Sequence, residues 1–199
     1  MNFAVFCSGH GTNLQAIIDA CRKGRLTAKL ALVVCDNPRA YAVERAKRAG
    51  IPVAVFGPKD FPSKKTLEAA IAKELDRRRI KLIALAGYMR ILSDGFVRKY
   101  RNRIINIHPA LLPAFKGGQA IKDAIQYGVK VTGPTVHFVT EEVDGGPIIL
   151  QETCPVKDDD TEAALLARVH KLEHSIYPRA IDLFAKGKLK LRGRKVIVK

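Results

Sequence analysis

An amide and an imidazole stand two residues apart at the end of a short apolar run. The run Ile104 to Ile107 predicts a buried strand, and Asn106 and His108 lie at its carboxyl end. Since residues two apart in a strand project to the same face, these side chains should stand side by side. An amide donor beside an imidazole that can donate a proton suits a carbonyl whose oxygen becomes negative. Taken alone, the pair is better explained structurally, with Asn106 as a turn residue and His108 as a cap.

The other polar residues have structural explanations when each is taken alone. Asp144 lies in the turn Val143-Asp144-Gly145-Gly146-Pro147, and aspartate before glycine is common in turns. His170 and His174 stand four residues apart, but no histidine has the Cys/His clustering that is typical of a zinc site. We therefore expect no metal site, and we expect His137 and His174 to be structural.

The first apolar run, Phe3 to Cys7, ends in Ser8-Gly9-His10-Gly11-Thr12-Asn13 and leads into a helix pattern. Glycines let the backbone turn tightly, and the amides at a helix start then point toward an anion. The segment predicts a phosphate site, and an ordinary tight turn is the structural alternative. Thr12 and Gln15 have the spacing of a capping box at the start of this helix.

A dinucleotide site is the rival prediction for this segment. Asp36 follows the second apolar run, where a ribose-binding acid would stand. However, Leu14 replaces the third glycine of the dinucleotide fingerprint, and the lysine of an ATP-type loop is missing. Both nucleotide fingerprints are therefore incomplete.

Length and composition predict one domain. The chain has 199 residues, of which 47% are hydrophobic and 27% charged, enough for one sizeable core. No apolar run approaches the ~20 residues that cross a bilayer, and Met1 leads directly into a strand-like stretch. We therefore predict a cytoplasmic protein with a single domain over residues 1–199. Its four cysteines, scattered along the chain, are expected to be buried free thiols.

The charge predicts anionic partners. Thirty-five Lys and Arg against nineteen Asp and Glu give a formal net charge of +16. Such a charge attracts nucleic acid and small anionic substrates alike, and a solvated basic surface is the structural alternative. The aromatic residues are better explained as core than as base-stacking platforms, so we expect no specific nucleic-acid partner.

Short apolar runs alternate with helix patterns over the first half of the chain. This alternation predicts an α/β fold with a mostly parallel sheet and helices on both faces. The expected strands are Phe3 to Cys7, Leu30 to Cys35, Val53 to Phe56, Leu82 to Ala86 and Ile104 to Ile107. The expected helices start near Leu14 and cover about Ala40 to Ala49, Lys64 to Arg79 and Ser93 to Tyr100.

The pattern changes in the last third. Val131 to Val139 and Pro147 to Val156 predict two more strands joined through the Asp144 turn, which makes the sheet mixed at that end. A long helix should follow from about Thr161 to Phe184. Residues 188–199 predict a small basic hairpin around Arg192-Gly193-Arg194.

Four motifs in this order resemble the phosphoribosylglycinamide formyltransferase family of folate-dependent enzymes. They are Ser8-Gly9-x-Gly11-Thr12-Asn13, Gly87-Tyr88-Met89-Arg90-Ile91-Leu92, Asn106-Ile107-His108-Pro109-Ala110-Leu111-Leu112-Pro113, and Thr135-Val136-His137-Phe138-Val139 with Asp144-Gly145-Gly146. The resemblance runs from about Phe3 to Phe184 and is far more specific than any single motif. It implies a Rossmann-like, three-layer formyltransferase fold.

The resemblance also implies roles for particular residues. Asn106, His108 and Asp144 would form the reacting centre. The ribonucleotide phosphate would lie on Gly11, Thr12 and Asn13, and its ribose near His170 and Glu173. The folate-binding residues would be Lys64, Met89, Arg90, Ile91, Leu92, Asn106, Thr140, Glu141, Glu142, Val143 and Asp144.

The reaction implied is transfer of a formyl group from 10-formyltetrahydrofolate to the amine of glycinamide ribonucleotide, in purine biosynthesis. The amine would attack directly, without a covalent enzyme intermediate or a metal. If Asp144 lies close to His108, its negative charge should raise the pKa of His108. The resemblance leaves open whether the protein is a monomer or a homodimer.

The chain departs from the family pattern at three places, and two related families remain to be weighed. Ala110 stands where serine is common, Lys64 where arginine can occur, and Gln119-Ala120-Ile121 replaces a segment that can carry histidine. The contacts of the loop from Ala114 to Ile121 therefore stay open.

Methionyl-tRNA formyltransferases resemble longer chains with a carboxyl-terminal nucleic-acid-binding barrel, and formyltetrahydrofolate hydrolases carry an added amino-terminal domain. A non-enzymatic anion-binding or RNA-binding module would leave the coincidence of Asn106, His108 and Asp144 unexplained.

Overall fold

A seven-stranded sheet forms the centre of the computed structural model, which describes residues 1–199. The strand order is β3-β2-β1-β4-β5-β7-β8. Strands β1 to β5 run parallel, whereas β7 is antiparallel to both of its neighbours. The strands are β1 (Asn2–Cys7), β2 (Lys29–Cys35), β3 (Val53–Val55), β4 (Ile80–Leu85), β5 (Ile104–His108), β7 (Thr135–Phe138) and β8 (Ile148–Gln151). The predicted mostly parallel sheet with a mixed end is confirmed.

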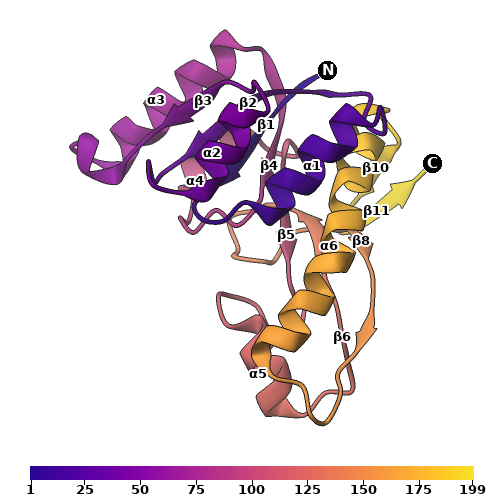
Figure 1. The fold of residues 1–199 in the computed structure, drawn as a ribbon. Coiled ribbons are helices and arrows are strands. Elements are labelled where there is room, and N and C mark those ends of the chain that lie inside the picture. The colour runs from indigo at the N-terminus through magenta and orange to yellow at the C-terminus, as the bar shows by residue number, and fades with distance from the viewer.

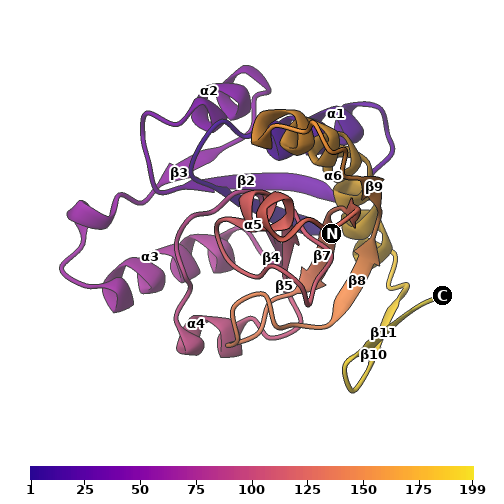
Figure 2. The same ribbon diagram turned by 90° about the horizontal axis from the view of Figure 1, so that it is seen from below.

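Helices cover both faces of this sheet and make three layers (Figures 1 and 2). On one face lie α1 (Thr12–Arg22), α2 (Tyr41–Arg48) and the long α6 (Glu162–Ala185). On the other lie α3 (Lys64–Arg77), which follows a short 3₁₀ turn at Pro58–Asp60, and α4 (Asp94–Lys99). The predicted helices agree with these to within a few residues at each end.

Alternation along each strand fills two separate cores. In β1, Phe3, Val5 and Cys7 pack with α1 and α6, whereas Ala4 and Phe6 pack with α3 and α4. All five are fully buried. A strand that is buried on both faces has a continuously apolar sequence, which is the pattern of a central parallel strand.

The capping box expected at Thr12 and Gln15 is wrong. Helix α1 begins after Gly11, which has a left-handed backbone (φ 71°), and no side chain caps it. A capping box occurs instead at α3, where Ser63 and Thr66 bond reciprocally. The first N–H groups of α1 therefore have no side-chain partner.

The two long strands expected after Lys130 are each divided. Residues 131–139 form β6 (Val131–Thr132) and β7, and residues 147–156 form β8 and β9 (Cys154–Pro155). The break follows from Gly133-Pro134, since proline donates no ladder hydrogen bond and a Cβ at Gly133 would overlap the Glu152 carbonyl. β6 and β9 pair with each other outside the main sheet.

A small third core lies beside this outer pair of strands. Helix α5 (Ala120–Tyr127), which the sequence analysis did not anticipate, packs against the first half of α6 through Ile121, Leu165 and Val169. In Figure 1 this part extends below the main sheet.

The predicted basic hairpin is present as β10 (Leu189–Arg192) and β11 (Lys195–Val198). The four cysteines are free thiols, and all except Cys21 are buried. None of the helices combines the length and the apolar character that crossing a membrane would take.

Candidate active site

Polar loops meet beyond the carboxyl ends of β1 and β4, where the strand order reverses direction. The Ser8 N–H donates to the Gly87 carbonyl at 3.1 Å. The Met89 N–H in turn donates to the Ser8 hydroxyl at 2.9 Å. Ligands of open α/β sheets bind at such a switch point, so this edge is the expected place for a site.

The next strand along, β5, brings Asn106 and His108 to this edge, as predicted. The antiparallel register of β5 and β7 sets Asn106 directly opposite His137. The Asn106 Nδ2 lies 3.3 Å from His137 Nε2, and His137 Nδ1 donates to the Phe138 carbonyl at 2.9 Å. Because a carbonyl only accepts, the proton of the neutral His137 ring is on Nδ1, and Nε2 accepts from the amide.

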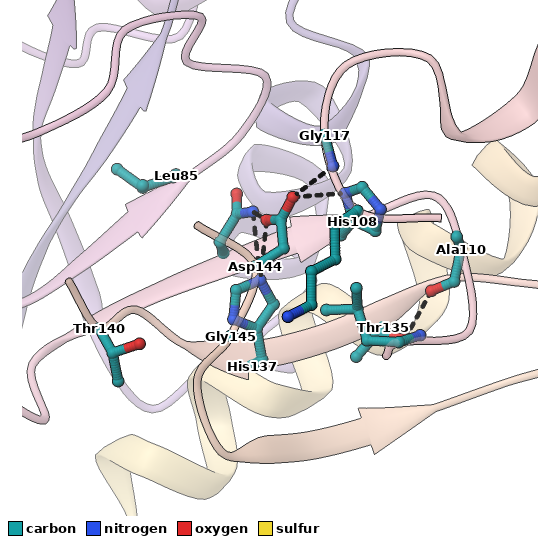
Figure 3. A network of polar contacts seen from close by, with 12 residues as sticks. Leu85, His108, Ala110, Gly117, Thr135, His137, Thr140, Asp144 and Gly145 are labelled. Atoms are coloured by element: carbon teal, nitrogen blue, oxygen red, sulfur yellow. Dashed lines mark hydrogen bonds and ion pairs between the residues drawn. The ribbon is translucent and has the colours of Figure 1, made fainter. Parts of the chain in front are cut away.

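Asp144 completes a group that we call the polar centre, composed of Asn106, His108, His137 and Asp144. Its Oδ1 lies 3.4 Å from Asn106 Nδ2 and 3.5 Å from His137 Nε2. Its Oδ2 lies 3.5 Å from His108 Nδ1. Figure 3 shows Asp144 between the two imidazoles. The expected approach of Asp144 to His108 is therefore present.

The backbone around Asp144 is tightly constrained. Asp144 itself has a left-handed backbone (φ 50°), which aspartate tolerates better than most residues. A Cβ at Gly146 would overlap the Phe138 carbonyl, so the turn returns to β8 only with glycine there. The turn motif thus serves to place one carboxylate.

The loop before α5 closes the polar centre through backbone groups. The His108 Nε2–H donates to the Phe115 carbonyl at 2.7 Å, and the Gly117 N–H donates to Asp144 Oδ2 at 2.9 Å. Phe115 and Gly117 both have positive φ, of 51° and 93°. The Lys116 ammonium pairs with the Glu142 carboxylate at 2.6 Å. The loop that the sequence left open is therefore part of the site.

The electrostatics of the polar centre correct one expectation. Burial lowers the pKa of His108 below its ordinary value, and Asp144 and the Phe115 carbonyl offset this only in part. The expected rise in the pKa of His108 is wrong, because the side chain is only 5% exposed. For Asp144, burial acts to raise the pKa, but a hydrogen bond from the protonated form of His137, the Gly117 N–H and the charge of His108 lower it to about 2.

The predicted ribonucleotide residues lie together on α1 and α6. A Cβ at Gly11 would stand 2.7 Å from the Ala42 Cβ, so the loop passes close to α2. The Asn13 Nδ2 donates to Glu173 Oε2 at 2.7 Å, and His170 Nε2 is 3.8 Å from the same oxygen. Burial raises the pKa of Glu173 to about 7, although the Asn13 bond lowers it.

The predicted folate segments carry exposed apolar side chains. Met89 is 76% exposed, Ile91 69% and Val143 50%. Leu92 is buried and packs with the α3–α4 core. The exposed carboxylate of Glu141, in the second of these segments, lies 3.9 Å from Arg98 of α4. Large exposed apolar side chains that gather on polar loops are typical of a ligand-binding surface.

Lys64 is exposed at the first turn of α3, and its side chain forms no hydrogen bond or ion pair with the other predicted folate residues. Glu68 stands four residues later on the same helix face. It accepts hydrogen bonds from the Ser93 N–H, at 2.7 Å, and from the Ser93 hydroxyl. Lys64 is therefore on the side of α3 that faces the end of the 89–93 segment.

Sequence reasoning missed three members of the site. His137 was expected to be structural, and only the strand register shows that it meets Asn106 and Asp144. Phe115 and Gly117 act through backbone atoms, which no side-chain pattern reveals. No group of three or more His, Cys, Asp or Glu side chains is arranged to hold a metal ion.

Comparisons with known proteins show the family to which the chain belongs. The formyl transferase family matches residues 1–181, so the chain belongs to the formyl transferase family. Within it, the chain is similar to phosphoribosylglycinamide formyltransferases. It is 46% identical to that enzyme of Bacillus subtilis, over 90% of this chain and 92% of the relative.

Two further relatives support the same grouping. The structure of glycinamide ribonucleotide transformylase 1 from Symbiobacterium toebii is 48% identical, with a TM-score of 0.97 over 100% of this chain and 93% of that chain. The human trifunctional purine biosynthetic protein adenosine-3 is 46% identical over 94% of this chain, which spans 19% of that relative's length. The predicted fold and family are confirmed.

Proposed function

We propose that this protein transfers the formyl group of 10-formyltetrahydrofolate to the amine of glycinamide ribonucleotide, giving formylglycinamide ribonucleotide and tetrahydrofolate. The observation that carries the proposal is the polar centre. It places an amide donor and two imidazoles within 3.5 Å of one ionised carboxylate, in a chain of the formyl transferase family.

The reaction proceeds by direct attack. The amine nitrogen forms a bond to the formyl carbon, and the carbonyl electron pair moves onto oxygen. The Asn106 amide donates to this oxyanion by giving up its 3.4 Å contact with Asp144. His108 assists by taking a proton from solvent as the charge forms, because a negative oxygen near Nδ1 favours the imidazolium, and it returns that proton to solvent as the intermediate collapses. Collapse of the intermediate breaks the bond to the folate nitrogen.

Asp144 moves the proton that the reaction must transfer. With a pKa of about 2 it is ionised at neutral pH. The attacking amine becomes an acidic ammonium in the tetrahedral intermediate, so even a weakly basic carboxylate accepts its proton, directly or through water. The same proton then neutralises the departing folate nitrogen. Each proton lost by the amine is gained by the leaving group, so no metal and no covalent enzyme intermediate are needed.

The ribonucleotide binds at the start of α1. Its phosphate accepts from the free N–H groups of Gly11, Thr12 and Asn13, where the helix dipole favours an anion. The ribose hydroxyls contact His170 and Glu173, which lie beside Asn13. The net charge of +16 attracts this phosphorylated substrate at long range.

The folate lies against Met89, Arg90, Ile91 and Leu92 on one side and Thr140 to Asp144 on the other. The exposed Met89, Ile91 and Val143 offer apolar surface to its flat ring system. Lys64 supplies a basic contact for its carboxylates. We further propose that residues 1–199 act as one cytoplasmic domain, as a monomer or a homodimer.

The direct test mixes the pure protein with both substrates. We expect formylated ribonucleotide and tetrahydrofolate in equal amounts, measured by mass spectrometry and by the absorbance of the folate product. Formate release without ribonucleotide would instead show a hydrolase, and formylation of a charged tRNA would show a different acceptor. Either result, without formyl transfer to the ribonucleotide, overturns the proposal.

A second measurement tests the direct attack. After incubation with the formyl donor alone, the intact mass of the protein should not change. A stoichiometric gain of about 28 Da, the mass that a formyl group adds, would show a covalent enzyme intermediate and sink this mechanism.

A further inference from the structure

The carboxyl-terminal hairpin is anchored on the edge of the sheet next to the polar centre. It begins at Leu189, beyond residues 1–181, which the family comparison matches. Leu189, Leu191 and Val196 pack against the core cluster to which Ile149 of the edge strand β8 belongs. In Figure 2 the hairpin lies outside β8. The hairpin therefore has a fixed position relative to the strand that follows the Asp144 turn.

The turn of this hairpin places the Arg194 guanidinium against the turn that contains Asp144. Gly193 has a left-handed backbone (φ 58°), which allows a tight turn between Arg192 and Arg194. The Arg194 Nη2 donates to the Gly145 carbonyl at 3.0 Å, in a partly buried contact. A guanidinium that donates to a carbonyl forms a charge-assisted hydrogen bond, which is stronger than a hydrogen bond between two neutral groups.

The residue that Arg194 holds is the direct neighbour of Asp144. The Gly145 N–H donates to the Glu142 carbonyl at 3.1 Å, so both backbone groups of Gly145 are bonded. Lys116 chiefly lowers the pKa of Glu142, and Arg194 contributes a smaller part. The turn is thus bonded on two sides: Gly117 donates to the Asp144 carboxylate in the polar centre, and Arg194 donates to the Gly145 carbonyl on the other side.

We propose that Arg194 is a positioning residue, which fixes the Gly145 peptide so that the Asp144 carboxylate stays aligned between His108 and His137. This inference rests on the proposed function, because the alignment matters only if Asp144 moves the proton. Small displacements of a reacting group lower rates steeply, so one outer hydrogen bond can control turnover without touching a substrate.

The first test compares single variants. Arg194→Ala should lower kcat about tenfold, with the KM of each substrate changed less than about twofold, since Arg194 touches neither substrate. Arg194→Lys should recover most of the loss because an ammonium also donates to a carbonyl. Arg192→Ala is the matched control: it removes the same charge from the same turn, and Arg192 makes no side-chain hydrogen bond or ion pair. Equal rates for Arg194→Ala and Arg192→Ala would overturn the proposal.

The second test asks whether Arg194 acts through Asp144. If it does, the double variant Arg194→Ala/Asp144→Asn should be no slower than Asp144→Asn alone. Losses that multiply would show that Arg194 acts independently of Asp144, and would refute the inference.

A third measurement does not depend on turnover. The ring resonances of His108, whose Nδ1 lies 3.5 Å from Asp144, should shift in Arg194→Ala and stay in place in Arg192→Ala. This holds whatever reaction the protein performs, so a failure of the proposed function is distinguished from a failure of this inference. Unshifted resonances in Arg194→Ala would count against the positioning role.

Discussion

The polar centre and the loop at the start of α1 lie at the same edge of the sheet, but they use their polar groups in opposite ways. In the polar centre both oxygens of Asp144 have protein partners, and both nitrogens of His137 do as well. At the start of α1, Gly11 is the N-cap and no side chain bonds the first N–H groups.

The difference is the one that the two proposed roles require. Groups that move protons must be oriented before the substrates arrive, and neighbouring side chains supply that order. A site for an anion must instead leave donors unpaired, because the ligand itself completes them. Changes in the polar centre should therefore affect turnover, whereas changes in the loop should affect binding.

The largest expected effect comes from Asp144→Asn, which keeps the shape of the side chain but removes its charge. General acid–base groups contribute typically ~10²–10⁴-fold, so kcat should fall by that order while both KM values change little. Steady-state kinetics and a thermal unfolding scan would measure this. Near-normal turnover with an unchanged pH profile would return Asp144 to the role of a turn residue.

The next largest effect should come from Gly11→Val, which alters the loop at the start of α1. A Cβ there meets Ala42 at 2.7 Å and sits on a backbone with φ 71°, so the loop must move. The KM for the ribonucleotide should rise about a hundredfold, far more than the KM for the folate, because the N–H groups at the start of α1 no longer all point toward the phosphate.

Gly9→Ala is the matched control for this change. A Cβ at Gly9 meets nothing within 4 Å, and its φ is not in the left-handed region. Its kinetics should stay close to those of the unchanged protein. Equal rises in both KM values for Gly11→Val would show that the loop is only structural.

How much the sequence predicts differs between these two regions as well. The loop at the start of α1 is a local feature, so Gly11, Thr12 and Asn13 were placed correctly at the start of a helix from their order alone. The error there was the capping box, since Thr12 lies inside the helix and the cap is a glycine. A capping pattern in the sequence specifies only the spacing of two residues. Which residue becomes the N-cap depends on backbone angles, which the pattern does not specify.

The polar centre depends on contacts between distant segments. The period-two rule placed Asn106 beside His108, but the partnership of His137 with Asn106 depends on the β5–β7 register, which spans 31 residues. The roles of Phe115 and Gly117 are carried by backbone atoms with positive φ. The balance of burial and charge at His108 also depends on packing, and the sequence gives only the charge.

Helix α5 shows that a local signal can also be overlooked. Gly128, with φ 82°, stops this helix, and glycine after an apolar-periodic segment is a typical stop signal. The helix has only 8 residues, and its first two lie in the segment Ala114 to Ile121, which was expected to be a loop. Its start at Gln119 has no side-chain cap, so the sequence marks only one end.

A smaller effect should come from Glu173, which links Asn13 to α6. Its pKa in the folded protein is about 7 and its ordinary value is 4.5, so folding favours the protonated form. Its contribution to stability is complete below about pH 4.5 and is lost as the pH rises through about 7. Glu173→Gln has no such loss and keeps an acceptor for Asn13. At pH 8 the variant should therefore gain on the order of 2 kcal/mol relative to pH 5.

Denaturant unfolding at both pH values would measure this gain. The unchanged protein, measured at the same two pH values, is the reference for this comparison. If Glu173→Gln were equally stabilising at pH 5 and pH 8, the carboxyl would not titrate between them. The link between α1 and α6 would then be an ordinary hydrogen bond.

The smallest expected effect concerns the proton on His108. Burial holds its pKa below the ordinary 6.5, and Asp144 partly offsets this. Removing the charge with Asp144→Asn should lower the pKa further, because the carboxylate favours the charged imidazole. Nitrogen-15 resonances of labelled histidine, assigned with a His108→Asn variant, would follow the titration. The neutral ring should carry its proton on Nε2, which donates to Phe115. A pKa above 6.5 in the unchanged protein would mean that Asp144 outweighs burial. The polar centre would then hold its proton before the substrates arrive, and His108 would donate from the start of the reaction instead of gaining its proton as the oxyanion forms.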